Sequence, residues 1–303
     1  EIYRHRGYFE PSEAEALKAG VDILLLPDDI EKSIAEINRY LRTGQLNEAD
    51  INRRVKKVLR AKYRMGLTGF DRLSERNVRT DLNTKKALAL KQELYENALT
   101  LVRNQGNLLP IQDLKNLQIA SLSIGTSGIT PFQERLGDYK QMQHFHTDAT
   151  ISEADERQLL DRLEGTDVVI VSLHDLSNYA SRNYGLNNTE MRFIQNLQRS
   201  HKVALVHFGN PYALKYFDDV NVVVNAYEED PLAQDAAAQA IFGATAFKGR
   251  LPVTASAKAR YNQGVQTKSL FRMGYGFPEN VNLNSNTLER IDVLMAEAIR
   301  NEA

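Results

Sequence analysis

Three consecutive carboxylates, Glu228, Glu229 and Asp230, stand directly after the apolar segment 221–227. Carboxylates this close repel one another when ionised, so one of them can keep its proton at neutral pH and serve as a general acid. The competing interpretation is structural, because Asp230 precedes Pro231, and an aspartate followed by a proline is a common start of a helix. We favour the structural interpretation, in which Asp230 caps a helix and the two glutamates are solvated.

A second group of polar residues follows the apolar segment 167–173. His174 comes first, and the loop behind it carries Arg182, Asn183 and Tyr184. Ligands of parallel α/β sheets bind beyond the carboxyl ends of the strands, and the planar fork of an arginine suits paired hydroxyl or carboxylate oxygens. These four residues are therefore our candidate substrate contacts. The alternatives are a hydrogen-bonded structural histidine at His174 and a surface ion pair on an ordinary loop at Arg182.

Signatures of the common catalytic and cofactor sites are missing. The sequence holds no GxSxG, SxxK or HExxH motif, and zero cysteines exclude thiolate chemistry. The segment 125–128, GTSG, is typical of a plain turn, because no phosphate-binding motif surrounds it. His144 and His146 alternate as on a strand, but no third ligand stands at a useful spacing. We therefore predict no catalytic residue, no cofactor and no metal ligand in this chain.

The composition is that of a globular chain with balanced charge. Its 303 residues are 42% hydrophobic, and 38 Lys and Arg residues stand against 39 Asp and Glu residues. A formal net charge of -1 offers no general attraction for nucleic acid or for anionic membranes. No apolar run approaches the roughly 20 residues that a membrane helix needs. The length suggests roughly two domains, and the composition leaves the cellular compartment open.

Strands and helices alternate through the middle of the chain. Short apolar segments rich in β-branched residues recur there, and amphipathic segments separate them. This pattern predicts a mostly parallel sheet that is covered on both faces, a three-layer α/β/α sandwich over residues 114–275. The predicted strands are 119–125, 167–174, 203–209 and 221–227, and the predicted helices lie near 131–137, 152–163, 188–199 and 231–242.

The beginning of the chain predicts one strand among helices. The apolar run 21–26, ended by Pro27, indicates a buried strand that feeds a helix. One strand cannot close a sheet, so we interpret residues 1–67 as the terminal strand-helix portion of an incomplete (β/α) barrel. Residues 68–113 then form a linker with a helix, and residues 276–303 a second linker and the first helix of a following domain. The helices predicted outside the sandwich are 29–42, 48–65, 84–103 and 286–302.

Five segments carry a family resemblance. They are AGVDILLLP at 19–27, INRRVKKVLRAKYRMGL at 51–67, ENALTLVRNQGNLLPI at 96–111, GNPYAL at 209–214 and AQAIFGATAFKGRLPV at 238–253. In their order and spacing they resemble glycoside hydrolase family 3. The resemblance implies the end of that family's barrel, a helical linker and its carboxyl-terminal α/β sandwich. It also implies retaining hydrolysis of glycosidic bonds by an aspartate on a barrel strand that lies before residue 1.

The resemblance also bears on the acid/base residue. In the family's β-glucosidase branch, the loop that follows the strand matching residues 167–174 supplies a glutamate as the acid/base. This glutamate stands a few residues before an Asp-Arg pair. Arg182 matches the arginine of that pair, but Ser181 replaces the aspartate, and no glutamate occurs between Asp175 and Asn188. The chain is therefore more similar to the β-N-acetylhexosaminidase branch, in which a His-Asp dyad on a barrel loop supplies the proton. This similarity implies a carbohydrate substrate, a barrel domain as partner and an isolated chain without activity.

The last helix, NTLERIDVLMAEAIRNEA, is similar to the opening helix of penicillin-binding-protein-like serine hydrolase domains. Such a fusion implies that the chain is an internal piece, and that it acts on cell-wall amino sugars in the periplasm or outside the cell. The alternative function is non-catalytic. A flavodoxin-like module of this kind would bind a carbohydrate or a nucleotide at the strand ends near Gly125 and Gly209.

Overall fold

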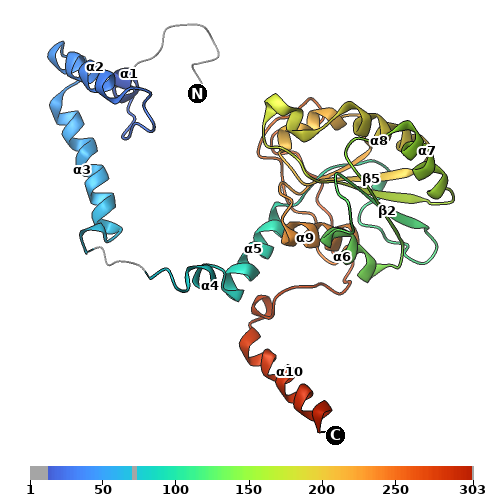
Figure 1. Ribbon diagram of the computed structural model, residues 1–303. Helices are drawn as coiled ribbons and strands as arrows, with labels where there is room; N and C mark the ends of the chain where they lie inside the picture. The colour runs from blue at the N-terminus through green and yellow to red at the C-terminus, as the bar shows by residue number, and fades with distance from the viewer. Residues whose placement is uncertain (1–12, 70–73, 302–303) are drawn as a thin grey trace. The chain divides into compact units, whose positions relative to one another are not determined.

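A computed structural model describes residues 13–69 and 74–301 of the chain. The chain divides into two compact units, one ending at Val78 and the other beginning at Arg79. Figure 1 shows that the first unit is helical and that the second contains the sheet.

Three α-helices and a 3₁₀ turn make up the described part of the first unit. They are α1 (Glu13–Lys18), α2 (Ile30–Arg42), α3 (Glu48–Arg64) and η1 (Leu67–Gly69). Asp29 and Asn47 cap α2 and α3, because each side chain accepts a hydrogen bond from a backbone N–H of the first turn. The helices predicted over 29–42 and 48–65 are confirmed. Gly66, just past α3, has a left-handed φ of +77°, a conformation that glycine commonly adopts at the end of a helix.

The strand predicted at 21–26 is wrong. Residues 21–26 are irregular, and the side chains of Leu25 and Leu26 are 84% and 85% exposed. A strand exists only where its backbone pairs with a neighbour, and no described residue before Val78 belongs to a strand. Residues 21–26 therefore form no strand with any described residue of this unit.

The helix predicted over 84–103 ends early. The second unit begins with α4 (Val78–Leu82), which straddles the boundary, and continues with α5 (Lys85–Ala98). Leu99 then leaves the helical conformation, and β1 (Thr100–Asn104) follows as a strand. Thr100 and Val102 are β-branched and buried, so pairing with a distant strand stabilises this segment more than another helical turn would.

A six-stranded sheet organises the second unit. Its other strands are β2 (Ile119–Ile124), β3 (Gln143–Thr147), β4 (Val168–Leu173), β5 (Lys202–His207) and β6 (Val222–Asn225). The strand order is β1-β6-β5-β4-β2-β3, in which β1 runs antiparallel to β6 and every other pair is parallel. The four apolar segments predicted as strands are confirmed as β2, β4, β5 and β6.

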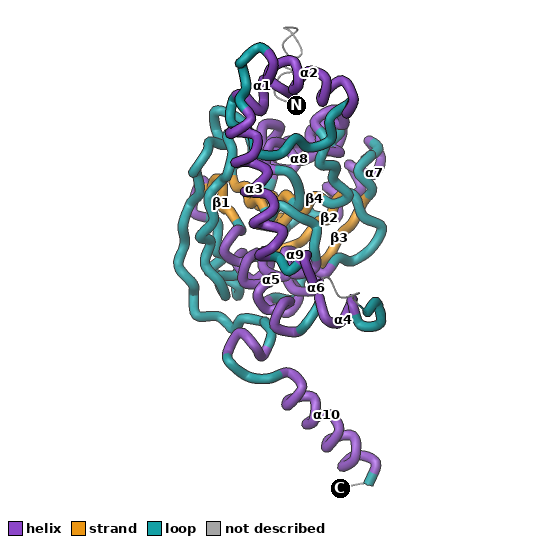
Figure 2. Tube along the Cα trace, turned by 90° about the vertical axis from the view of Figure 1, so that its left-hand side faces the viewer, coloured by secondary structure: helices purple, strands orange, loops and turns teal. Residues whose placement is uncertain are grey.

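Helices cover both faces of this sheet, as Figures 1 and 2 show. On one face, α7 (Glu153–Arg162) and α8 (Asn188–Ser200) pack over the sheet, and Phe193 and Leu197 of α8 are fully buried there. On the other face lie α6 (Pro131–Tyr139) and α9 (Pro231–Ile241), and α5 packs against α9. The three-layer α/β/α sandwich predicted from the sequence is confirmed.

Short 3₁₀ segments and one long helix complete the second unit. The 3₁₀ segments are η2 (Gln105–Asn107), η3 (Ala180–Gly185), η4 (Pro211–Phe217) and η5 (Pro278–Val281), and the helix is α10 (Ser285–Arg300). The predicted helix at 286–302 is confirmed as α10 over its described residues. The helices of the described chain are all too short or too polar to cross a membrane.

Candidate functional site

The carboxyl ends of the parallel strands gather four loops at one edge of the sheet. These loops follow β2, β4, β5 and β6, and they include residues 125–130, 174–187, 208–212 and 226–230. Open α/β sheets bind their ligands at this edge. All four predicted substrate contacts lie in the loop after β4 or at its start.

His174 is held from both sides of its ring. Nδ1 lies 2.9 Å from Oε1 of Glu229, and Nε2 lies 2.9 Å from Oγ of Ser172. The imidazole side chain is fully buried and also packs beside the ring of Phe208, with 5.2 Å between the centroids. Both ring nitrogens are thus occupied by the protein, which is the arrangement of a structural histidine.

The acidic run after β6 is built into the fold. Asp230 caps α9, because its Oδ1 accepts a hydrogen bond of 3.0 Å from the backbone N–H of Leu232. The predicted cap is therefore confirmed. Glu228 and Glu229 are both exposed, in agreement with the prediction that they are solvated, but each also has a protein partner. Glu228 accepts a hydrogen bond of 2.6 Å from the Tyr95 hydroxyl, and Glu229 binds His174 and the backbone of the loop after β4.

Glu229 does not have the pKa of a general acid. Burial alone would raise the pKa of its carboxyl, but the hydrogen bonds from His174 and from the Asp175 backbone N–H outweigh burial and hold the pKa below its ordinary value. An ionised carboxylate with both oxygens occupied cannot deliver a proton to a leaving group.

The loop after β4 folds back on itself. The backbone N–H of Ser177 donates to the carbonyl of Tyr184 at 2.9 Å, and left-handed φ angles of +49° and +59° at Asn183 and Tyr184 turn the chain. Tyr184 is 7% exposed and belongs to the core, whereas Asn183 is exposed and its Oδ1 accepts a hydrogen bond of 3.3 Å from the hydroxyl of Tyr216. Of these two predicted contacts, only Asn183 presents its side chain to solvent.

Arg182 lies in the same loop, within η3, and is exposed. Its guanidinium is 5.8 Å from the ring of Tyr179, and in the described part of the chain it has no carboxylate partner. The surface ion pair considered as its alternative role is therefore not formed among those residues. Tyr179 and Tyr212 are 66% and 45% exposed, and they stand on two loops that a hydrogen bond from Asn210 to the Asn178 carbonyl joins. Sequence reasoning did not single out these two tyrosines, although aromatic residues in strand-end loops are a usable signal.

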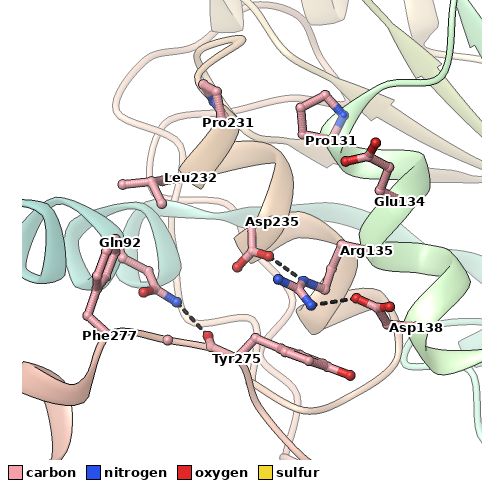
Figure 3. A pocket seen from close by; sticks show the side chains of 11 residues that line it. Gln92, Pro131, Glu134, Arg135, Asp138, Pro231, Leu232, Asp235, Tyr275 and Phe277 are labelled. Atoms are coloured by element: carbon pink, nitrogen blue, oxygen red, sulfur yellow. Dashed lines mark hydrogen bonds and ion pairs between the residues drawn. The ribbon is translucent and has the colours of Figure 1, made fainter. Parts of the chain in front are cut away.

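A cavity lies elsewhere, between α5, α6, α9 and the segment around Tyr275 (Figure 3). It has a volume of about 360 Å³. Arg135 is bound there by both Asp235 and Asp138, and its guanidinium lies 3.7 Å from the ring centroid of Tyr275. Gln92 donates to the Tyr275 carbonyl at 2.7 Å. These polar groups bind one another, and they join three helices to the segment around Tyr275.

The remaining sequence candidates take structural positions. Gly125 has a φ of +88°, and a Cβ atom there would lie 2.5 Å from the carbonyl oxygen of His174, so the GTSG segment needs its first glycine for a close turn. The Nδ1 atom of His144 lies 2.7 Å from the Ser121 hydroxyl, and burial lowers the pKa of that histidine. No cluster of three metal-ligating side chains occurs within residues 13–69 and 74–301.

The sandwich has known relatives. A family model, the Glycosyl hydrolase family 3 C-terminal domain, matches residues 99–279. The chain belongs to glycosyl hydrolase family 3. The matched segment begins at Leu99, one residue before β1, so the family domain includes the strand that replaces the end of the predicted helix.

Parts of the chain are also similar to individual proteins. A protein of Formosa agariphila, named as a candidate beta-xylosidase, is 30% identical over 114 residues, which are 37% of this chain and 15% of that protein. A family 3 beta-N-acetylglucosaminidase from Paenibacillus sp. aligns with 80% of this chain and 47% of its own at 18% identity and a TM-score of 0.54. A beta-glucosidase from Erythrobacter marinus aligns with 80% of this chain and 40% of its own at 17% identity and a TM-score of 0.53. The chain thus spans less than half the length of these relatives, and the structural likenesses show a shared fold.

Proposed function

We propose that this chain is the sandwich part of a family 3 β-N-acetylglucosaminidase, and that a (β/α) barrel domain supplies the nucleophile and the acid. The observation that carries the proposal is the loop after β4. It holds one carboxylate, Asp175, and the neighbouring Glu229 has both oxygens engaged by His174 and Asp175. Retaining hydrolysis needs two carboxyl groups about 5 to 5.5 Å apart, and the loop itself supplies only one.

In this proposal the loop contributes binding. Arg182 presents five N–H donors at the rim of the sheet edge, and a guanidinium fork fits paired sugar hydroxyls or the acyl oxygen of an N-acetyl group. Tyr179 and Tyr212 offer exposed aromatic faces nearby, onto which the apolar face of a sugar ring can pack. Amino sugars of the bacterial cell wall, in the periplasm or outside the cell, are the substrates we propose.

The direct test is Arg182→Ala in the full-length protein. The variant is expected to lower kcat/KM for an aryl β-N-acetylglucosaminide by roughly tenfold or more, equivalent to about 1.4 kcal/mol of transition-state binding. Its thermal unfolding should hardly change, because Arg182 is exposed and has no ion pair among the described residues. The matched control is Arg199→Ala, at an exposed position near the end of α8, which should leave kcat/KM as it is. Unaltered kinetics in Arg182→Ala would mean that Arg182 does not contact the substrate and that the loop is only structural.

The isolated chain gives a second test. We expect the purified 303-residue chain not to hydrolyse aryl β-N-acetylglucosaminides, because the loop after β4 supplies one carboxylate and the neighbouring Glu229 has both oxygens engaged. Release of the aryl group would be followed by absorbance, with Glu228→Gln and Glu229→Gln measured in parallel. Turnover that either substitution abolishes would contradict the proposal. Calorimetric titration with amino sugars and nucleotides completes the test, since nucleotide affinity without a sugar response would favour a nucleotide-binding module.

A further inference from the structure

We infer that Glu229 is a positioning residue for the loop 175–187, and that it sets where Arg182 meets the sugar. The inference rests on the proposed function of Arg182. Glu229 belongs to the segment between β6 and α9, yet its two carboxylate oxygens bind the first two residues after β4. Oε1 lies 2.9 Å from Nδ1 of His174, and Oε2 accepts the backbone N–H of Asp175 at 2.7 Å. One side chain therefore fixes both the ring and the backbone from which the loop departs.

The histidine side of this contact is anchored inside the sheet. Nε2 of His174 meets the hydroxyl of Ser172 on β4, and that hydroxyl lies 2.8 Å from the hydroxyl of Ser123 on β2. Ser123, Ser172 and the imidazole side chain are all fully buried. Hydrogen bonds in such a chain hold each side chain in one rotamer, so the position of Glu229 is set by two central strands.

The backbone side of the contact holds a conformation that the chain does not favour by itself. Asp175 has a φ of +51°, in the left-handed region that residues with a side chain seldom occupy. A residue stays there only where its surroundings impose it, and the bond from its N–H to Glu229 is such a restraint. Losing this bond would let Asp175 relax toward an extended conformation and would turn the loop about its first residue.

The rest of the loop is tied together, so a turn at its start would move it as one body. The N–H of Ser177 donates to the Tyr184 carbonyl, and the N–H groups of Arg182 and Tyr184 both donate to the Tyr179 carbonyl at 3.1 Å. Gly185 permits this closure, since a Cβ atom there would lie 2.7 Å from the Ser177 nitrogen. Arg182 stands seven residues beyond Asp175 in an exposed part of this loop, so a rotation about Asp175 would displace it. Displacements of about 1 Å at a binding group are enough to lower catalytic efficiency strongly.

A double-mutant cycle in the full-length protein tests the inference. Glu229→Gln keeps the shape of the side chain but loses its charge and one of its two accepting oxygens. It can keep both partners only through the other tautomer of His174, and those neutral hydrogen bonds are weaker than bonds to a carboxylate. We expect it to lower kcat/KM for an aryl β-N-acetylglucosaminide by about three- to tenfold, with the same division between kcat and KM as Arg182→Ala. The double variant should be no worse than Arg182→Ala alone, because the two residues act through one contact. The matched control is Glu228→Gln, the adjacent glutamate, which binds Tyr95 and not the loop.

The outcomes separate the inference from the proposed function. Additive losses in the double variant, or normal kinetics in Glu229→Gln beside impaired kinetics in Arg182→Ala, would overturn the inference alone. Normal kinetics in Arg182→Ala would overturn both.

Hydrogen exchange of the folded chain supplies a readout that does not depend on activity. Amides of residues 175–186 should exchange faster in Glu229→Gln while those of β6 stay protected, and unchanged exchange in the loop would refute the inference. If Glu229→Gln does not fold, Glu229→Asp, which keeps the charge but shortens the reach, takes its place in the same measurements.

Discussion

Gly249→Ala is expected to destabilise the sandwich by about 3 kcal/mol or more. A Cβ atom at this position would overlap the carbonyl oxygen of Ala98 and lie 2.6 Å from the hydroxyl of Thr100. The first obstacle is backbone at the junction of α5 and β1, which cannot move aside as a flexible side chain can. The Gly249 N–H also donates to the Leu99 carbonyl at 3.1 Å, so the two backbones are held in contact.

Urea unfolding followed by circular dichroism would measure this effect as a lower midpoint with an unchanged slope. The matched control is Gly128→Ala, because a Cβ atom at Gly128 would meet no neighbouring atom within 4 Å and the φ of this glycine is not in the left-handed region. That variant should stay within about 0.5 kcal/mol of the parent chain. Equal midpoints for the two variants would show that the backbone at the junction of α5 and β1 can move to accommodate a Cβ atom. Packing would then not require a glycine at position 249.

The strands that the sequence predicts correctly are those with the simplest environment. Residues 168–173 are apolar or small and fully buried, since helices cover both faces of β4, and no alternation is needed to recognise such a run. β1 escaped prediction because its pairing is not local. Thr100 pairs with Asn225 on β6, far along the chain, whereas the helical pattern of α5 immediately precedes it. The strand predicted at 21–26 is absent, because an apolar composition alone does not supply a neighbouring strand with which the backbone can pair.

The candidate site was predictable in its place and not in its contacts. The rule that ligands meet the carboxyl edge of a parallel sheet located the loop after β4 from the pattern alone. The contact between Glu229 and His174 joins residues 55 positions apart, and only the order of the strands brings them together. The burial of Tyr184 depends on left-handed backbone angles at two residues that are not glycine, which no local propensity indicates.

Two buried titratable groups give this fold opposing responses to pH. Glu190 is 2% exposed and completes a capping box at the start of α8, where its Oε1 accepts the Asn187 N–H at 2.8 Å. Burial raises its pKa from 4.5 to about 7, although the bond from Asn187 acts in the other direction. The folded state therefore binds this proton more tightly than the unfolded state. The contribution of Glu190 to stability is complete below pH 4.5 and is lost as the pH rises through about 7.

His207 changes the stability of the fold with pH in the opposite direction to Glu190. It is fully buried at the end of β5, and its Nδ1 must donate to Oδ1 of Asn225 at 2.8 Å, because a carbonyl oxygen only accepts. Its Nε2 has no partner among the described residues, so burial lowers the pKa from 6.5 to about 4. The unfolded state binds this proton more tightly. Stability from His207 is therefore complete above pH 6.5 and is lost as the pH falls through about 4.

Glu190→Gln should separate these two effects. Glutamine can still accept the Asn187 N–H and complete the capping box, but it carries no charge to bury. We expect the variant to be more stable than the parent chain by about 1 to 3 kcal/mol at pH 8 and nearly equal to it at pH 4.5. Between about pH 4 and 6.5 its free energy of unfolding should rise steeply with pH, because His207 is no longer opposed. Urea unfolding at closely spaced pH values would measure both slopes, with the exposed Glu164→Gln as the charge-matched control. Parallel stability curves for the parent chain and Glu190→Gln across this range would mean that Glu190 is ionised in the fold at neutral pH without cost.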